Sequence, residues 1–207
     1  MVIQLFDFIT NTIIQIISAT GYVGLFLLMV AESCGAPAPS TIVMPFSGFL
    51  VATGQMNFWL AVIVGTFANL TGSLLVYFIS LKGGRPLLEK YGRYILIGKQ
   101  DLDKADKWFA KYGEATVFFS RLFPLIRTAI SFPAGVAKMN FKKFVVFSFL
   151  GSLVWNIVLV FLGIKLQNNW EAVRKIISSF GSVILILFLL AAGLYAWRHI
   201  KKRKRAS

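Results

Sequence analysis

Two arginines lie inside an otherwise apolar run that prolines interrupt. Arg121 and Arg127 belong to the stretch 118–135, which also contains Pro124 and Pro133. An arginine that faces lipid at the centre of a bilayer costs about 2.5 to 3.5 kcal/mol, so arginines in such a run usually mark a polar pathway. A guanidinium group forms planar, paired hydrogen bonds with carboxylates and phosphates. The two arginines could therefore bind a lipid phosphate, or they could pair with an acidic side chain and with backbone carbonyls.

Glu32 is the second residue that could carry chemistry, because it ends an apolar run and precedes a proline-rich turn. It is the only acidic residue between Asp7 and Glu89. Burial and neighbouring cations shift the proton affinity of a carboxyl group in opposite directions. Glu32 could therefore carry protons, or it could be the structural counter-ion of an arginine. Because there are two arginines and one carboxylate, one positive charge would remain to bind an anionic ligand.

Prolines in both stretches disturb regular helix geometry. Pro37, Pro39 and Pro45 follow Glu32, and the arginine stretch contains two more prolines. Broken backbone at membrane depth is found only where it packs on protein or lines a watery cavity. We therefore predict two re-entrant hairpins, one over residues 33–56 and one over 115–137. Further polar residues could line the same cavity or form hydrogen bonds between helices: Ser40, Thr41, Asn69, Thr128, Ser131 and Asn156.

The composition indicates an integral membrane protein. Of the 207 residues, 57% are hydrophobic and 14% are charged, and the mean hydropathy is +0.73. The formal net charge is +14, yet no lysine or arginine precedes Lys82. Nucleic-acid binding is not expected, because apolar spans separate the basic clusters and no known nucleic-acid-binding motif is present. The single cysteine, Cys34, excludes an intrachain disulfide and a multi-cysteine metal site, and we expect no cofactor.

Apolar and charged segments alternate along the chain and set the expected elements. Four apolar runs are long enough to cross or steeply enter a bilayer: residues 8–31, 58–81, 144–166 and 176–197. Residues 82–113 carry too many charges to cross, so we expect either an amphipathic surface helix or a soluble-facing connector there. Residues 198–207 form a basic tail.

The distribution of basic residues predicts the orientation. The positive-inside rule places the basic tail and the cluster 138–143 in the cytoplasm. If residues 115–137 crossed the membrane, the lysine-rich segment 82–113 would lie outside, whereas a re-entrant hairpin keeps both basic flanks inside. We therefore predict an all-α integral membrane fold, an inverted repeat of re-entrant hairpin plus transmembrane helix, with flanking N- and C-terminal helices. Many secondary transporters build their binding sites where broken helices of such repeats meet.

Several motifs resemble the DedA family, which is also described through the VTT or SNARE-associated domain. The resemblance runs from about residue 21 to residue 170. It rests on Glu32 with Pro37, Pro39 and Ser40, on Pro45-Phe-Ser-Gly48, on Gly72 with Tyr77 before Gly83-Gly-Arg85, on Phe119-Ser-Arg-Leu-Phe-Pro-Leu-Ile-Arg127, on Ala134-Gly135, Met139 and Phe144, and on Gly151 with Trp155-Asn156.

The resemblance implies a bacterial inner-membrane lipid transporter. Its substrate would be undecaprenyl phosphate or a phospholipid, moved between leaflets with dependence on the proton-motive force. Its partners would be a membrane lipid with a phosphate headgroup and protons, and a homo-oligomer is compatible with the sequence. The family turn commonly reads P-x-P-S-E or carries an aspartate nearby, whereas Thr41 follows Ser40 here. A two-carboxylate proton relay is therefore not carried over to this chain.

Two other classes of function give contrasting expectations. An enzyme is not expected, because the single histidine, His199, lies in the basic tail and no nucleophile with a base partner is recognisable. The alternative to transport is a membrane-organising or assembly factor, in which the arginine stretch is purely structural.

Overall fold

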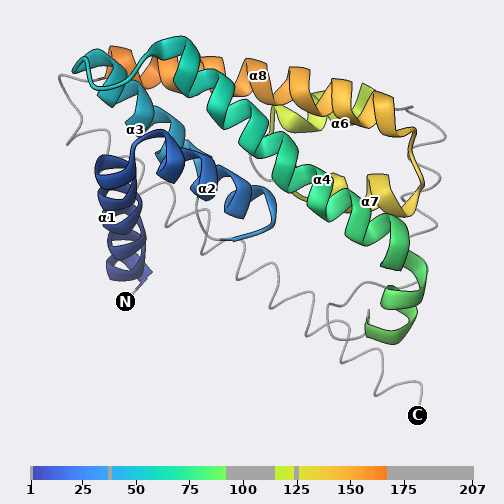
Figure 1. Ribbon diagram of the computed structural model, residues 1–207. Helices are drawn as coiled ribbons and strands as arrows, with labels where there is room; N and C mark the ends of the chain where they lie inside the picture. Colours follow the sequence, from blue (N-terminus) through green and yellow to red (C-terminus); the bar gives the residue numbers. More distant parts are fainter. Residues whose placement is uncertain (1, 37–38, 92–114, 124–125, 167–207) are drawn as a thin grey trace.

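A computed structural model describes residues 2–36, 39–91, 115–123 and 126–166. Within these ranges the chain folds into helices and contains no strand, so the predicted all-α class is confirmed for this part (Figure 1). The helices are α1 (Val2–Thr20), α2 (Tyr22–Ser33), α3 (Ser40–Ala52), α4 (Phe58–Tyr91), α6 (Ala115–Arg121), α7 (Ser131–Val136) and α8 (Phe141–Lys165).

Helices α4 and α8 contain the two described segments that are long and apolar enough to cross a membrane. These segments are Phe58–Gly83 and Phe141–Lys165. Helix α8 begins at a capped end, since the side chain of Asn140 accepts a hydrogen bond from the backbone N–H of Lys143. The two long helices pack against each other, and α8 runs along the top of Figure 1 above α4.

The four shorter helices after α1 pack on this long pair in a regular way. We call α2 and α3 the first helix pair, and α6 and α7 the second helix pair. In the first pair α2 packs on α4 and α3 packs on α8. In the second pair α6 packs on α8 and α7 packs on α4. Each pair therefore contacts both long helices, and α3 and α7 lie toward opposite ends of the long pair in Figure 1.

Glycine allows α3 and α8 to cross at backbone contact. A Cβ atom at Gly48 would collide with the carbonyl oxygen of Val160, and one at Gly163 would collide with the carbonyl oxygen of Pro45. Any larger residue at either position would push the two helices apart. Small residues at such crossings are the usual means of close helix packing in membranes.

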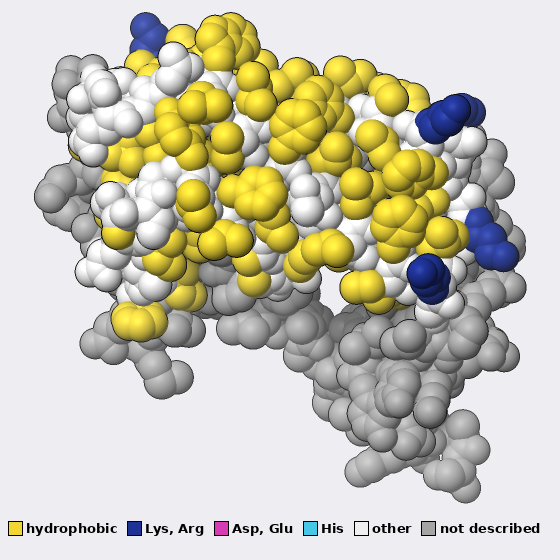
Figure 2. Space-filling model, viewed as in Figure 1, with side chains coloured by type: hydrophobic (Ala, Val, Ile, Leu, Met, Phe, Trp, Pro, Cys, Tyr) yellow, Lys and Arg dark blue, Asp and Glu magenta, His cyan; other side chains and the backbone are white. Residues whose placement is uncertain are grey.

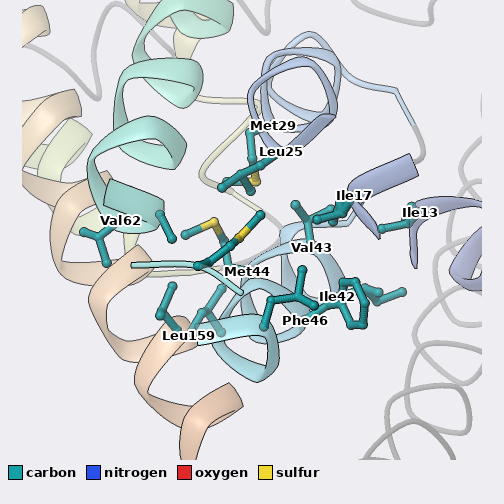
Figure 3. Packing of buried hydrophobic residues seen from close by; sticks show 14 of the residues in the cluster. Ile13, Ile17, Leu25, Met29, Ile42, Val43, Met44, Phe46, Val62 and Leu159 are labelled. Carbon is teal, nitrogen blue, oxygen red and sulfur yellow. The ribbon is translucent and has the colours of Figure 1, made fainter. Parts of the chain in front are cut away.

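A hydrophobic core surrounds this crossing. Figure 3 shows Leu25 and Met29 of α2 pointing toward Val43 and Met44 of α3, with Val62 of α4 on the other side. These five side chains are fully buried. The first helix pair is thus held to α4 by apolar packing and to α8 by the glycine contacts.

The outer face of the long helices is apolar. Large hydrophobic side chains are exposed along both helices, for example Leu75 and Ile79 on α4 and Val158 and Phe161 on α8. Figure 2 shows hydrophobic side chains over most of this face, with lysine and arginine only toward its edges. A face of this kind is suited to contact with lipid chains.

The first apolar run differs from its prediction. Residues 8–31 were expected to form one continuous inserted helix, but the structure has α1 and α2 with a break at Gly21. Gly21 has φ of 59° and ψ of −126°, a backbone conformation outside the helical region that glycine adopts without a Cβ clash. The expected single helix is therefore wrong, and Figure 1 shows α1 turning steeply away from α2.

Two further helix boundaries differ from the prediction. The expected hairpin 33–56 contains only one helix, α3, because its partner is α2, which ends at Ser33. Helix α4 does not stop at residue 81 but continues to Tyr91, since charged residues end a membrane span without ending backbone hydrogen bonding. Expectations for residues 92–113, 176–197 and 198–207 lie outside the described residues. The re-entrant and inverted-repeat arrangement stays a prediction.

Candidate functional site

The two helix pairs meet through an ion pair. Glu32 lies in the last turn of α2, and Arg127 lies in the turn between α6 and α7. The Nη2 group of Arg127 donates hydrogen bonds to both carboxylate oxygens of Glu32. Both residues are buried, with 9% and 4% of their surfaces exposed. Residues that are 95 positions apart in the sequence thus share one buried contact.

The carboxylate of Glu32 also binds the start of α3. Its Oε1 accepts a hydrogen bond of 3.1 Å from the backbone N–H of Ser40, the first residue of that helix. The first N–H groups of a helix lack partners within the helix, and the helix dipole favours negative charge there. The N-cap residue Pro39 supplies no side-chain hydrogen bond. Glu32 therefore satisfies both a helix start and an arginine.

Arg127 has a third neighbour on α8. Its guanidinium carbon lies 5.8 Å from the centroid of the Trp155 ring, within the range of a cation–π interaction. The indole Nε1 of Trp155 is buried and has no hydrogen-bond partner among the described residues. A donor without a partner thus lies on the residue that stacks against Arg127.

Arg121 has a different environment. Its Nη2 donates to the hydroxyl oxygens of Ser131, at 3.0 Å, and Ser148, at 3.1 Å. Only 3% of Arg121 is exposed, and its Nε is buried without a hydrogen-bond partner in the described part of the chain. No carboxylate among the described residues lies within ion-pair distance of it. A buried guanidinium held only by neutral hydroxyl groups is costly, and an anion would offset that cost.

The two predicted asparagines serve contacts between helices. Ser33 of α2 donates a hydrogen bond of 2.9 Å to Oδ1 of Asn69 on α4. Asn156 of α8 donates through Nδ2 to the hydroxyl of Thr66 on α4, at 3.2 Å, and its Oδ1 is buried without a partner in the described residues. No hydrogen bond joins either asparagine to Glu32 or to the arginines.

The remaining predicted site residues divide into two groups. Thr41 and Thr128 are half-buried beside residues that the site uses. Pro37 and Pro124 lie outside the described residues. Sequence reasoning missed Ser148 as a partner of Arg121, and its one available signal is its position three residues before Gly151, on the same face of α8.

The site lies near the middle of Phe58–Gly83, the apolar segment of α4. Cys34, two residues after Glu32, lies with its Sγ 3.8 Å from the carbonyl oxygen of Gly72. Gly72 is fourteen residues after Phe58 and eleven before Gly83, the ends of that segment. The ion pair is thus far from both ends of the span.

The first helices of the two pairs contact their long helices in the same pattern. On α4, Gly72 lies against the carbonyl oxygen of Val30 and the side chain of Ser33. On α8, Gly151 lies against the carbonyl oxygen of Phe118 and the side chain of Arg121. In each case the hydrogen bond from the first helix reaches the residue three positions before that glycine, Asn69 or Ser148.

Comparisons with known proteins show which family the chain resembles. The VTT domain family matches residues 38–165. Undecaprenyl phosphate transporter A of Bacillus subtilis is 40% identical over 183 residues, which cover 88% of this chain and 89% of that protein. The protein of the same name from Staphylococcus aureus is 31% identical, with 93% and 97% covered. A Lactococcus lactis protein named alkaline phosphatase-like protein is 38% identical, with 92% of each covered. No solved structure matches the chain.

Proposed function

The chain belongs to the VTT domain family, and from this premise we propose that it moves an anionic lipid between the leaflets of the bacterial cytoplasmic membrane. The proposed substrate is undecaprenyl phosphate or another lipid with a phosphate headgroup. Two relatives named undecaprenyl phosphate transporter A favour the polyprenyl phosphate over a phospholipid. The proposed driving force is the proton gradient, and the proposed topology is multi-pass with a cytoplasmic C-terminus.

The observation that carries the proposal is the uncompensated charge of Arg121. The sequence favours Arg127 as the phosphate ligand, because it lies beyond Pro124, where the predicted hairpin would turn at the depth of the membrane midplane. In the structure Glu32 already neutralises Arg127, while Arg121 has no carboxylate partner among the described residues and keeps a free Nε donor. Arg121 is therefore the better candidate for the resting contact with a phosphate.

The surroundings of Arg121 suit a phosphate. Ser131 and Ser148 hold one terminal nitrogen and so fix the plane of the guanidinium group. A phosphate in that plane would accept hydrogen bonds from the remaining donors, in the planar geometry that distinguishes arginine from lysine. The isoprenoid or acyl chains of the lipid would lie along the exposed apolar faces of α4 and α8.

Glu32 supplies a route for proton coupling. Protonation of its carboxylate would remove the charge that binds Arg127. Arg127 would then be free to join Arg121 on the phosphate, which carries more charge than one arginine offsets. Loss of the proton would restore the ion pair and weaken the hold on the lipid. This scheme needs one carboxyl group, in agreement with Thr41 in place of the acid common in the family turn.

An inverted repeat is the architecture that would give the site access to both leaflets. The matching contacts of α2 on α4 and of α6 on α8 support such a repeat. The second helix of each pair supports the repeat further, because it packs on the long helix of the other half of the chain: α3 packs on α8, and α7 packs on α4. Transporters of this kind alternate access by moving one repeat against the other.

The test is lipid transport by the purified protein in liposomes of defined composition. We expect a fluorescent polyprenyl phosphate to exchange between leaflets, and a pH gradient to accelerate the exchange. Arg121→Lys keeps the charge but loses the planar donors, so binding should weaken by about 1 to 3 kcal/mol, or roughly 5- to 150-fold. Lys142→Ala, at an exposed position in the first turn of α8, is the matched control and should transport normally.

Other outcomes would support other functions. Release of inorganic phosphate from the lipid would indicate a hydrolase, as the name of the Lactococcus lactis relative suggests. A well-folded protein that neither moves nor cleaves the lipid would indicate a membrane-organising or assembly factor. Full activity in Arg121→Lys would refute the role assigned to this arginine.

A further inference from the structure

The second helix of each pair crosses a long helix of the other half of the chain at a glycine. A Cβ at Gly48 of α3 would collide with the carbonyl oxygen of Val160 on α8. A Cβ at Gly135 of α7 would approach the carbonyl oxygen of Tyr77 on α4 to 2.5 Å. The two crossings are of the same kind, so their positions along the long helices are comparable.

The first helices of the pairs define which positions on α4 and α8 correspond. Helix α2 meets α4 at Asn69 and Gly72, and α6 meets α8 at Ser148 and Gly151. In both cases the residue on α8 lies 79 positions after the residue on α4. A position on α4 therefore corresponds to the position 79 residues later on α8.

By this correspondence the two crossings differ by one helical turn. Helix α3 packs Gly48 against Gly163 of α8, whose counterpart on α4 is Gly84. Helix α7 packs Gly135 against Ser80 instead, four residues earlier on α4. A helix rises 1.5 Å per residue, so the difference is about 6 Å.

The counterpart position on α4 carries the residue type that a crossing requires. At Gly163 the carbonyl oxygen of Pro45 takes the place of a side chain, so only glycine fits. Gly84 is also a glycine, and it lies inside α4 about one turn beyond Ser80. Glycine destabilises the interior of a helix, so local stability does not explain Gly84. Close approach of another helix to α4 at this position does explain it.

We propose that α7 has two registers on α4, one helical turn apart, and that the second helix pair moves between them. The structure holds the register at Ser80, and the alternative is the register at Gly84. One-turn shifts of one packed element past another are a known form of switching, because close-packed interfaces have discrete arrangements. This inference rests on the inverted repeat proposed above.

The first helix pair lacks this freedom. The counterpart of Ser80 on α8 is Leu159, which is 6% exposed and belongs to the hydrophobic core. A one-turn shift of α3 would bring Gly48 onto this larger side chain. The movement is therefore confined to the second helix pair, in which Gly135 of α7 packs against the small hydroxyl of Ser80.

Among the described residues, one hydrogen bond ties the end of α7 to α4. The hydroxyl of Tyr77 on α4 donates to the carbonyl oxygen of Met139, just beyond the end of α7, at 2.6 Å. A shift of α7 along α4 would break this bond. It would also move Arg127 away from Glu32, because Arg127 lies in the turn that leads into α7. The register of α7 is thereby linked to the ion pair of the site.

Distances between spin labels test the alternative register directly. Trp59, near the start of α4, is exposed and Phe132 of α7 is half-buried, so both positions can be labelled without filling the crossing. In a Cys34→Ser background, we expect labels at Trp59→Cys and Phe132→Cys to show two distance populations about 6 Å apart in detergent. Adding Tyr77→Phe should raise the share of the longer distance. Labels at Trp59→Cys and Val146→Cys, on the two long helices, are the matched control and should show one distance.

A second measurement covers the case in which the double variants do not fold. Gly84→Leu should melt at the wild-type temperature, because α7 lies at Ser80, yet it should reduce lipid exchange at least tenfold by blocking the second register. Gly83→Leu should retain exchange. A single distance between the labels on Trp59→Cys and Phe132→Cys, populations insensitive to Tyr77→Phe, or normal exchange by Gly84→Leu would each overturn the proposal. The distances are measured without lipid, so their failure is distinguishable from failure of the transport function.

Discussion

At the scale of single residues, the site depends on how one carboxylate is divided among its partners. Glu32 accepts hydrogen bonds from Arg127 and from the first N–H of α3, so it joins the two helix pairs and also stabilises a helix start. Arg121 is left with two serine hydroxyls. The two arginines therefore differ in their partners, and we propose that Arg121 is the one available to an anion.

Glu32→Gln separates these roles. Removing the carboxylate charge leaves Arg127 buried without a counter-ion, so we expect a loss of about 3 kcal/mol in unfolding free energy, the lower end for a broken buried pair because glutamine keeps one acceptor oxygen. Lipid binding should persist or strengthen, since Arg127 is then free for the phosphate. Acceleration of exchange by a pH gradient should be lost.

The measurements are thermal unfolding with and without a polyprenyl phosphate, and exchange with and without the gradient. A ligand that binds only the folded state raises the melting temperature, so the lipid should stabilise Glu32→Gln more than the wild type. Unchanged gradient dependence would end the proton-carrier role and leave Glu32 as a structural counter-ion. Thr41→Val, next to Ser40 in α3, is a control that should alter neither measurement.

The sequence was informative about which residues form the site and less so about their pairing. Charge inside an apolar run marked Glu32, Arg121 and Arg127, because such residues are costly in a membrane unless they have partners or a task. Which arginine meets Glu32 depends on how turns 95 residues apart are packed, and no local pattern encodes that. Asn69 and Asn156 were marked on polarity alone, and the structure gives them interhelical hydrogen bonds.

At the scale of elements, close crossings at glycine fix the positions of the short helices. The crossing of α3 and α8 is the tightest, because glycines on both helices face backbone atoms of the partner. Gly48→Ala and Gly163→Ala should each destabilise the protein by about 1 to 3 kcal/mol, the usual cost of overpacking, because backbone cannot move aside. Thermal unfolding in detergent measures the effect.

Gly65→Ala is the matched control for these substitutions. Its added Cβ would lie 2.8 Å from the Sδ atom of Met44, the flexible end of a long side chain that adapts easily. The loss of stability should therefore be clearly smaller than at the α3–α8 crossing. Equal losses at all three positions would mean that side-chain volume, and not backbone contact, sets the cost.

Element boundaries show where sequence patterns stop being informative. The apolar segments of α4 and α8 stand out by hydropathy, and their described bounds lie close to the expected ones. The break at Gly21 does not stand out, because a single glycine is common in apolar helices and only the fold determines whether its φ becomes positive. The extension of α4 to Tyr91 is hidden for another reason, since hydropathy reports where a span ends and not where a helix ends.

At the scale of the whole molecule, the arrangement of the helix pairs has one consequence for access. Cys34 lies beside the middle of α4, and it is exposed in the structure. At that depth a side chain reaches water only through a cavity. In an inverted repeat the first helix pair enters from the face opposite to the second pair, so we expect water to reach Cys34 from the outside.

Thiol labelling tests this orientation together with the re-entrant arrangement of residues 115–137. The native Cys34 should react with a membrane-impermeant reagent added from outside. In a Cys34→Ser background, Lys104→Cys and Lys142→Cys should both react only from the cytoplasmic side, because a hairpin that returns to its own face leaves both flanks on that face, in accord with the positive-inside rule. Lys142 lies in the first turn of α8 and is exposed, so its accessibility is not limited by packing. Labelling of positions 104 and 142 from opposite sides would mean that the segment between them crosses the membrane. The two helix pairs would then not be inverted copies, and the correspondence between α4 and α8 would have to arise without an inverted repeat.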